Sequence, residues 1–419
     1  MRKIVLAIAA SAVYFAAAAQ SEPEQTVKIA SLDMMSGSMA GLGLNVLKGF
    51  QHSVQLANQD GWAGRVKLQI VPFDNKYSPQ EALTILNIII GQDIRYVVQG
   101  ASSSAVGVAL MEAIERHNTR NPGKEIVYLN YASQAPVMTN AKCSYWHFRF
   151  DANSDMKVDS MTTYLARQSS IKKIYQINPN YSYGQDVAKA TRETLARKRP
   201  EVQVVGEDFL PTGQVKDFAP YAAKIRQSGA DAVVTAGAGQ DLSLLVRAMR
   251  DAGLNIDLYT LNANTYGVPA AVGAAGEGRV KLVSTFSPND PRFKGGKVID
   301  SFKEKFNEDF INGAGHNAIV ALSQAIREAR STDPIAVAAR LEGMKFEGLN
   351  GPVELRRDDH QAQQQVFVTS WKKVDGKRVV HDQDATGFGW MPVDTVNAAD
   401  AVLPTSCVMK RPAAKANRS

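Results

Sequence analysis

Three consecutive serines, Ser102, Ser103 and Ser104, stand between an apolar run and a segment whose apolar residues recur at helical spacing. Backbone N–H groups and hydroxyls at the start of a helix favour an anionic group. This serine turn (residues 100–104) lacks the lysine of a G-x-x-x-x-G-K-[ST] loop, which argues against phosphate transfer. One serine is enough to cap a helix, so three in a row favour contact with an anionic ligand over capping alone.

Two further loops carry polar or aromatic residues directly after an expected strand. Ala132, Ser133 and Gln134 follow the apolar run at 125–130, and Tyr181 and Tyr183 follow the run at 173–178. Ligands of open α/β sheets bind beyond the carboxyl ends of the strands. We therefore expect the first loop to lie beside the serine turn. The two tyrosines are candidate walls with a polar tip, and ordinary loop aromatics are the alternative interpretation.

The sequence lacks the usual patterns of catalysis and metal binding. No G-x-S-x-G motif occurs, and the six histidines show neither H-E-x-x-H nor another ligand spacing. We therefore expect no catalytic residue, no metal and no cofactor, which favours a binding protein over an enzyme.

The N-terminus has the pattern of a secretory signal peptide. Arg2 and Lys3 precede an apolar run that ends in three alanines at 17–19. The run is shorter than a membrane-spanning helix requires, and no cysteine lies near the cleavage site for lipid attachment. We expect residues 1–19 to be removed near Ala19 and the mature chain to be exported.

Export to an oxidising compartment gives the two cysteines a structural interpretation. Cys143 and Cys407 are an even pair without metal-ligand spacing, so we predict a disulfide between them. The formal net charge of +7 comes from scattered basic residues, four of them in the tail. Without a basic cluster interleaved with aromatics, no nucleic-acid partner is expected.

Strands and helices alternate along the chain, which predicts two α/β lobes with parallel sheets. Ser78, Pro79 and Glu81 predict a helix start with a capping box, and Gly253 is expected to end the helix at 241–252. The rhythm breaks at 148–155, and a short strand pair is expected around 351–355 and 365–380. We assign 27–149 with about 285–358 to the first lobe, 150–284 with about 359–405 to the second, and 406–419 to a tail.

Together these residues carry a resemblance to a known family. "GASSS" after the third strand, "ASQAP" after the fourth, then "FRF", "YSYGQ" and "RAMRDAGL" resemble the periplasmic solute-binding proteins of ABC importers, in particular the leucine/isoleucine/valine-binding (type I) class. The resemblance covers nearly the whole mature chain. It implies two Rossmann-like lobes joined by three hinge crossings, with a solute held between them.

The same resemblance implies roles for particular residues. Ser103 and Ser104, with Ser102 as a one-residue ambiguity, match the residues that hold the ligand carboxylate. Ala132 and Gln134 match further contacts in the first lobe, although a threonine is usual where Gln134 stands. Tyr183 matches the tyrosine of the second lobe that covers the ligand.

One departure from the family concerns the ligand's ammonium group. The amino-acid binders carry an acidic residue after the strand that corresponds to "LYTLN", whereas this chain has Asn262 and Asn264. A buried ammonium without a counter-charge is costly. Either Asp241 or Asp33 supplies the charge, or the ligand is an aromatic or aliphatic acid without an ammonium.

The expected function is the capture of a small carboxylate-bearing solute and its delivery to an inner-membrane ABC permease and its ATPase. We expect a monomer. A protein that senses the solute and signals to a receptor is the alternative, and an exported hydrolase using the serine turn is a third class.

Overall fold

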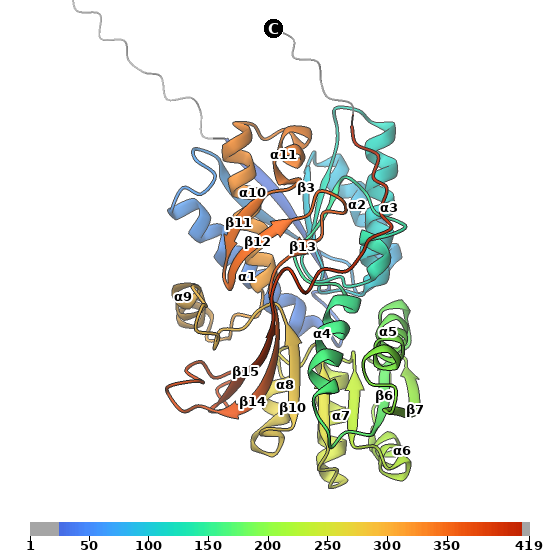
Figure 1. Ribbon diagram of the computed structural model, residues 1–419. Helices are drawn as coiled ribbons and strands as arrows, with labels where there is room; N and C mark the ends of the chain where they lie inside the picture. Colours follow the sequence, from blue (N-terminus) through green and yellow to red (C-terminus); the bar gives the residue numbers. More distant parts are fainter. Residues whose placement is uncertain (1–24, 413–419) are drawn as a thin grey trace, which may run out of the picture.

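Two α/β lobes, each with its own sheet, make up the protein (Figure 1). The computed structural model describes residues 25–412, so the expected signal peptide and residues 413–419 of the tail lie outside the described residues. No helix in the described range has the length and apolar character to cross a membrane.

The first sheet has five parallel strands in the order β2-β1-β3-β4-β5. Its strands are β1 (Thr26–Asp33), β2 (Lys67–Asp74), β3 (Tyr96–Gln99), β4 (Val127–Asn130) and β5 (His147–Arg149). The helices of this lobe are α1 (Ala40–Gln59), α2 (Pro79–Gly91), α3 (Ser104–Arg120), the 3-10 turn η1 (Pro136–Thr139), α10 (Gly313–Ala329) and α11 (Pro334–Leu341). One apolar core joins these strands to helices from both ends of the sequence.

The second sheet has seven strands in the order β15-β14-β10-β9-β8-β6-β7. Its strands are β6 (Lys173–Pro179), β7 (Gln203–Leu210), β8 (Ala232–Thr235), β9 (Asp257–Thr260), β10 (Val280–Ser284), β14 (Val366–Lys373) and β15 (Phe388–Val396). Around it lie α4 (Ser154–Ala166), α5 (Ser182–Lys198), α6 (Ala219–Ser228), α7 (Gly239–Asp251), α8 (Val268–Val272) and the 3-10 turn η2 (Ala274–Gly276). Five neighbouring strands of this sheet (β7, β6, β8, β9 and β10) are parallel, whereas β14 runs antiparallel to both of its neighbours.

The chain passes between the lobes at three places: between β5 and α4, between β10 and α10, and between β13 and β14. The second connection contains α9 (Gly296–Phe306). A small antiparallel sheet of β11 (Lys345–Gly348), β12 (Gly351–Leu355) and β13 (Ala362–Gln363) precedes the third. The tail then returns from β15 to the first lobe, where Cys407 forms the predicted disulfide with Cys143.

The expected strand pair of 351–355 and 365–380 is wrong. The first segment is β12 of the small sheet, whereas β14 pairs with β10 and β15 in the second lobe. Residues 366–371 of β14 are all buried, as expected for a strand inside a sheet that is covered on both faces. Such a strand needs neighbours on both sides, and a single hairpin partner does not provide them.

Local signals placed one helix start and one helix end to within one residue. Ser78 Oγ accepts the backbone N–H of Glu81 at 3.4 Å, and α2 begins at Pro79. The expected capping box also requires the Glu81 side chain to accept the backbone N–H of Ser78. That N–H donates to the Asn75 carbonyl instead. Helix α7 ends at Asp251, and Gly253 follows the capping residue Ala252 with a left-handed φ of 66°.

Candidate functional site

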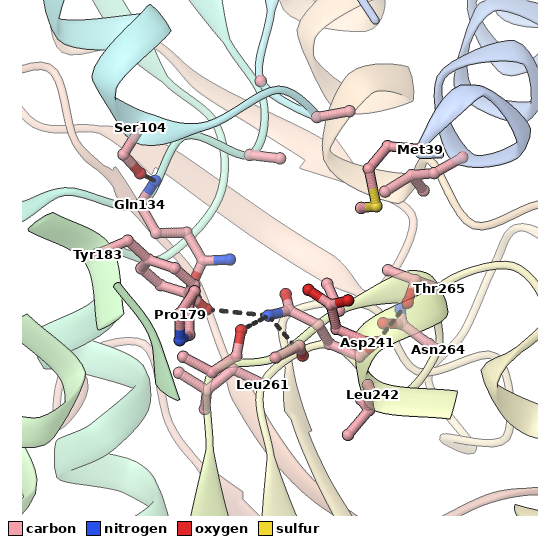
Figure 2. A pocket seen from close by; sticks show the side chains of 18 of the residues that line it. Met39, Ser104, Gln134, Pro179, Tyr183, Asp241, Leu242, Leu261, Asn264 and Thr265 are labelled. Carbon is pink, nitrogen blue, oxygen red and sulfur yellow. Dashed lines mark hydrogen bonds between the residues drawn. The ribbon is translucent and has the colours of Figure 1, made fainter. Parts of the chain in front are cut away.

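A cavity of about 180 Å³ lies between the two lobes, at the carboxyl ends of strands from both sheets. A void of about 150 Å³ admits a benzene-sized molecule, so this one suits a small solute. Figure 2 shows its polar and apolar walls. The predicted residues that line it are Ser102, Ser104, Ala132, Gln134, Tyr181, Tyr183, Asp241, Asn262 and Asn264.

Three other predicted residues lie behind the wall of this cleft. Ser103 occupies the N-cap position of α3, although its side chain makes no capping hydrogen bond. Ser133 is buried, and its hydroxyl donates to Gln99 Oε1 at 3.2 Å. Asp33 ends β1 beneath the serine turn and is also buried.

The carboxylate of Asp33 is the anion that part of the serine turn binds. Its Oδ1 accepts the backbone N–H groups of Gly100 at 3.3 Å and Ser102 at 2.9 Å, and the Ser102 hydroxyl at 3.2 Å. Its Oδ2 accepts the Tyr131 hydroxyl at 2.6 Å. Burial raises the pKa of Asp33 to about 6, although these hydrogen bonds lower it. The donors of Gly100 and Ser102 are therefore occupied from within the protein.

Ser104 is the serine that remains free to donate into the cleft. Its Oγ accepts the backbone N–H of Gln134 at 3.2 Å, which leaves the hydroxyl proton for a ligand oxygen. Ser104 also begins α3, and helix N-termini favour negative charge. Ala132 and Ser133 donate their N–H groups to Asn130 Oδ1 at 3.1 and 2.8 Å, so their backbone donors are already used.

A hydrogen-bonded chain crosses the cleft from one lobe to the other. The Tyr183 hydroxyl of α5 donates to Gln134 Oε1 at 3.5 Å, and it accepts Asn262 Nδ2 at 3.1 Å. Asn262 Nδ2 also donates to the Ala236 carbonyl at 2.9 Å. Burial raises the pKa of Tyr183, so it stays neutral at physiological pH. Asn262 thus orients the tyrosine across the cleft.

The carboxylate of Asp241, in the first turn of α7, points into the cavity (Figure 2). Its Oδ2 accepts the backbone N–H of Gly213 at 2.8 Å. Burial raises the pKa of Asp241, and this effect outweighs the lowering by Gly213 and by the more distant Lys216. No lysine, arginine or histidine of residues 25–412 forms an ion pair with it.

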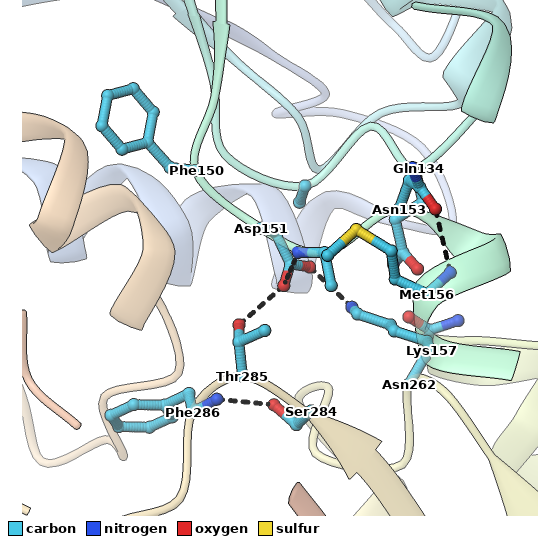
Figure 3. Close-up of polar contacts among 12 residues, drawn as sticks. Gln134, Phe150, Asp151, Asn153, Met156, Lys157, Asn262, Ser284, Thr285 and Phe286 are labelled. Carbon is cyan, nitrogen blue, oxygen red and sulfur yellow. Dashed lines mark hydrogen bonds and ion pairs between the residues drawn. The ribbon is translucent and has the colours of Figure 1, made fainter. Parts of the chain in front are cut away.

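Sequence reasoning missed an ion pair in the wall of the cleft, between Asp151 and Lys157 (Figure 3). Lys157 Nζ lies 2.6 Å from Asp151 Oδ2, and its side chain is 4% exposed. The Thr285 hydroxyl donates to Asp151 Oδ1 at 2.7 Å. This cluster joins the first crossing to α4 and to the second crossing. From sequence, the segment 148–155 was identified only as a boundary between lobes. Its contact with Thr285 could not be predicted, because Thr285 is distant in sequence.

An apolar contact and two tyrosines connect the lobes across the cleft. A Cβ at Gly239 would meet the end of Met39 of the other lobe at 3.2 Å, and the hydroxyls of Tyr77 and Tyr181 hydrogen-bond across the gap. No histidine or cysteine occurs among the described residues that line the cavity. The site thus has the means to hold a solute, and its serines lack a histidine as a partner for nucleophilic attack.

Comparisons with known proteins agree with this architecture. The profile of the family described as "Periplasmic binding protein" matches residues 26–377. The Leu/Ile/Val-binding protein homolog 4 of Brucella abortus (strain 2308) is 30% identical, covering 97% of this chain and 97% of the relative. The Leu/Ile/Val-binding protein of Escherichia coli (strain K12) is 24% identical, covering 78% of this chain and 86% of the relative.

Solved structures are similar over almost the whole chain. A leucine-, isoleucine-, valine-, threonine- and alanine-binding protein from Brucella ovis, in a closed conformation, has a TM-score of 0.81 at 27% identity, covering 93% of this chain and all of that one. A solute-binding protein from R. palustris in complex with benzoate has a TM-score of 0.76 at 19% identity, covering 91% and 99%. The second likeness concerns the fold alone. The chain belongs to the periplasmic binding protein family, as the profile and the Brucella relatives show.

Proposed function

We propose that this chain is the substrate-binding component of an ABC importer and works in the periplasm. It captures a small carboxylate-bearing solute between its lobes and delivers it to an inner-membrane permease with its ATPase. The observation that carries the proposal is the cleft between the lobes, whose polar groups come from both lobes and which the hydrogen bond from Tyr183 to Gln134 spans. Such a cleft closes around a solute, and the closed form gives a permease a distinct surface to bind.

Within this cleft we propose Ser104 as the direct contact of the carboxylate. Gln134, Tyr183 and Asn262 would enclose the solute from the side, while Tyr181 and Asn264 contribute to the wall of the second lobe. Ser102 and Ser103 would support the turn, as would Ala132 and Ser133 in the neighbouring loop. The protein would act as a monomer and without a catalytic step.

The test is to identify the solute and then to measure its binding. Protein purified without refolding is denatured, and the released small molecules are identified by mass spectrometry. Calorimetry with L-leucine, L-valine, benzoate and 4-hydroxybenzoate then gives affinities. If no solute is released and none of these compounds binds, the proposed function is wrong.

Replacing Ser104 tests the carboxylate contact separately. A hydrogen bond to a charged group contributes about 1.5–3 kcal/mol, so Ser104→Ala should weaken binding by roughly tenfold or more. Ser228→Ala is the matched control, because the hydroxyl of this serine, which ends α6, bonds to the nearby backbone of Ile225 and Ala230, and the residue does not line the cleft. Equal affinities of the Ser104 variant and wild type would contradict the contact and leave the function standing.

A further inference from the structure

The C-terminal tail crosses from the second lobe to the first within a few residues after β15 (Figure 1). Ala401 is 4% exposed and packs in the apolar core around α4 of the second lobe. The side chain of Leu403 still packs against that core, whereas its carbonyl accepts Arg356 Nη1 at 3.0 Å. Arg356 directly follows β12, whose Leu355 lies in the core of the first lobe. The tail thus contacts both lobes around Leu403.

The first-lobe end of the tail is attached to the segment that continues the loop of Gln134. Gln134 lines the cleft, and η1 begins two residues later. Thr405 Oγ1 donates at 2.6 Å to the carbonyl of Thr139, which is the last residue of η1. The attachment therefore lies close to a wall of the cleft.

A covalent bond completes this attachment. The N–H of Ser406 donates to Asn140 Oδ1 at 3.0 Å, and Cys407 is bonded to Cys143. Water competes for the donor and acceptor of a hydrogen bond, whereas a disulfide persists until a thiolate attacks it. The disulfide therefore keeps the tail on the first lobe even when the hydrogen bonds open.

The tail crosses at a place where the two lobes face each other across a groove. The groove is lined by Pro136 and Val137 of the first lobe, by Asp155 of α4 and Ala190 of α5 in the second lobe, and by Leu403 of the tail. Any motion that widens this groove must therefore also stretch the tail.

The crossing segment is too short to let the lobes separate widely at this edge. Three residues, 402–404, lie between Ala401 and Thr405. An extended chain advances at most about 3.6 Å per residue, so the segment spans about 14 Å at most. Pro404 has a fixed φ, which removes one of the rotations. A hinge motion that takes η1 away from the core around α4 is limited to this span unless one end of the segment is released.

We propose that residues 397–407 form a strap that limits how far the cleft opens, and that the disulfide between Cys143 and Cys407 holds its end. The inference goes beyond solute capture, because it concerns the range of the lobe motion and applies to any solute. Three crossings by themselves permit hinge rotation of two lobes, and the strap narrows that rotation. Reduction of the disulfide takes two electrons and two protons from a dithiol, which is itself oxidised to a disulfide. It leaves two thiols and a strap held by noncovalent contacts alone.

Lengthening the strap tests its reach without breaking the disulfide. About eight glycine and serine residues, which form a flexible linker, are inserted between Ala401 and Val402. The disulfide already closes a loop with a sequence separation of 264 residues, so the insertion changes the entropy of loop closure little. The midpoint of urea denaturation should therefore stay close to that of wild type. The same insertion between Pro122 and Gly123, in an exposed turn of the first lobe, is the matched control.

Small-angle X-ray scattering and amide hydrogen exchange measure the opening. Both are recorded on protein that has been freed of bound solute by unfolding in guanidinium and refolding, without reductant. The strap insertion should give a larger radius of gyration than the control insertion. Amide exchange should be at least about threefold faster in segments 100–104 and 236–242, which contain cleft-lining residues of the two lobes.

Two results would overturn the inference. One is an equal radius and equal exchange in the two insertion variants. The other is a lower urea midpoint in the strap variant than in the control variant, because the tail would then act on stability and not on the range of opening.

Dithiothreitol and the double variant Cys143→Ser, Cys407→Ser test the role of the disulfide. Reduced wild type and the double variant, both checked for folding by circular dichroism, should show the larger radius of gyration. Dithiothreitol should cause no further increase in the double variant. If the strap insertion expands the protein and reduction of wild type does not, noncovalent contacts are enough to hold the strap, and the part assigned to the disulfide is wrong.

Discussion

The three serines of the turn have three different environments, although the sequence presents them as equivalent. Ser102 faces Asp33 and Asn75 inside the first lobe, with Asn75 Nδ2 at 2.8 Å from its hydroxyl. Ser103 occupies the cap position, and Ser104 lines the cleft. The division depends on Asp33, which reaches the turn from a neighbouring strand. The serine turn therefore binds the carboxylate of Asp33 through Ser102 and leaves Ser104 available to a ligand.

Asp33 should give the stability of this protein a measurable pH dependence. Its pKa is about 6 in the folded chain, against an ordinary value of 3.8, so the folded state binds the proton more tightly. The resulting stabilisation is present below pH 4 and is lost as the pH rises from about 4 to about 6. It amounts to about 3 kcal/mol. Urea denaturation should therefore show that the stability advantage of wild type over Asp33→Asn is smaller at pH 7 than at pH 4 by most of that amount.

A second carboxylate provides the control of opposite sign. Three backbone N–H groups lower the pKa of Asp375, so its contribution is present above the ordinary pKa and is lost as the pH falls. The advantage of wild type over Asp375→Asn should thus not shrink between pH 4 and pH 7. A constant difference between wild type and the Asp33 variant across this range would show that the buried carboxylate titrates normally.

At the scale of elements, the three crossings are fastened to one another by polar contacts around one short segment. Thr285 of the second crossing donates to Asp151 of the first, and Lys157 of α4 pairs with the same carboxylate. Gln361 Nε2 donates to the Asp151 carbonyl at 2.7 Å, and Gln364 Nε2 donates to the Phe150 carbonyl at 2.6 Å. The first crossing is therefore the common partner of the other two.

Breaking the ion pair at this junction should destabilise the whole protein. Lys157→Met leaves the Asp151 carboxylate buried without its cation, which typically costs about 3–5 kcal/mol. Urea denaturation at pH 7 should show this loss, and adding Asp151→Asn should restore part of it. Lys189→Met in α5 is the control, because the side chain of Lys189 is 68% exposed. A loss in the Lys157 variant no larger than in the control would contradict the role of the pair.

At the scale of the whole molecule, the tail connects the lobes a fourth time. After β15 the chain returns to the first lobe, where Thr405 Oγ1 donates to the Thr139 carbonyl at 2.6 Å and Cys407 is bonded to Cys143. Further along the tail, Arg411 Nε lies 2.7 Å from Glu342 Oε1 of the first lobe. Sequence alone predicted the disulfide. Only the folded chain shows that this disulfide fixes the tail to the first lobe and so connects the two lobes.

Removing this disulfide should lower the stability of the folded protein. The bond closes a loop with a sequence separation of 264 residues, and loss of a native disulfide typically costs about 2–5 kcal/mol. Urea denaturation of the double variant Cys143→Ser, Cys407→Ser should show this loss, and dithiothreitol should cause a similar loss in wild type. Dithiothreitol should leave the double variant unchanged. An effect of the reductant on that variant would mean that another cause is acting.

Local sequence patterns were enough to predict the alternation of strands and helices, the disulfide pair and the loops that reach the cleft. These features follow from local periodicity, from turn residues and from the rule that ligands bind at the carboxyl ends of parallel strands. Ser104, Gln134 and Tyr183 were found in this way, because each follows an apolar strand, whereas Asp241 was named only as one possible partner of an ammonium group.

Which of these groups are free to meet a ligand depends on contacts between distant segments of the chain. Asp33 and Ser102 are adjacent in space although 69 residues separate them, and no local pattern reports that their donors and acceptors satisfy each other. The same holds for Asp151, Lys157 and Thr285. Hydrogen bonds and ion pairs depend on distances of a few ångströms between distant segments, and only the packing of the two lobes sets those distances.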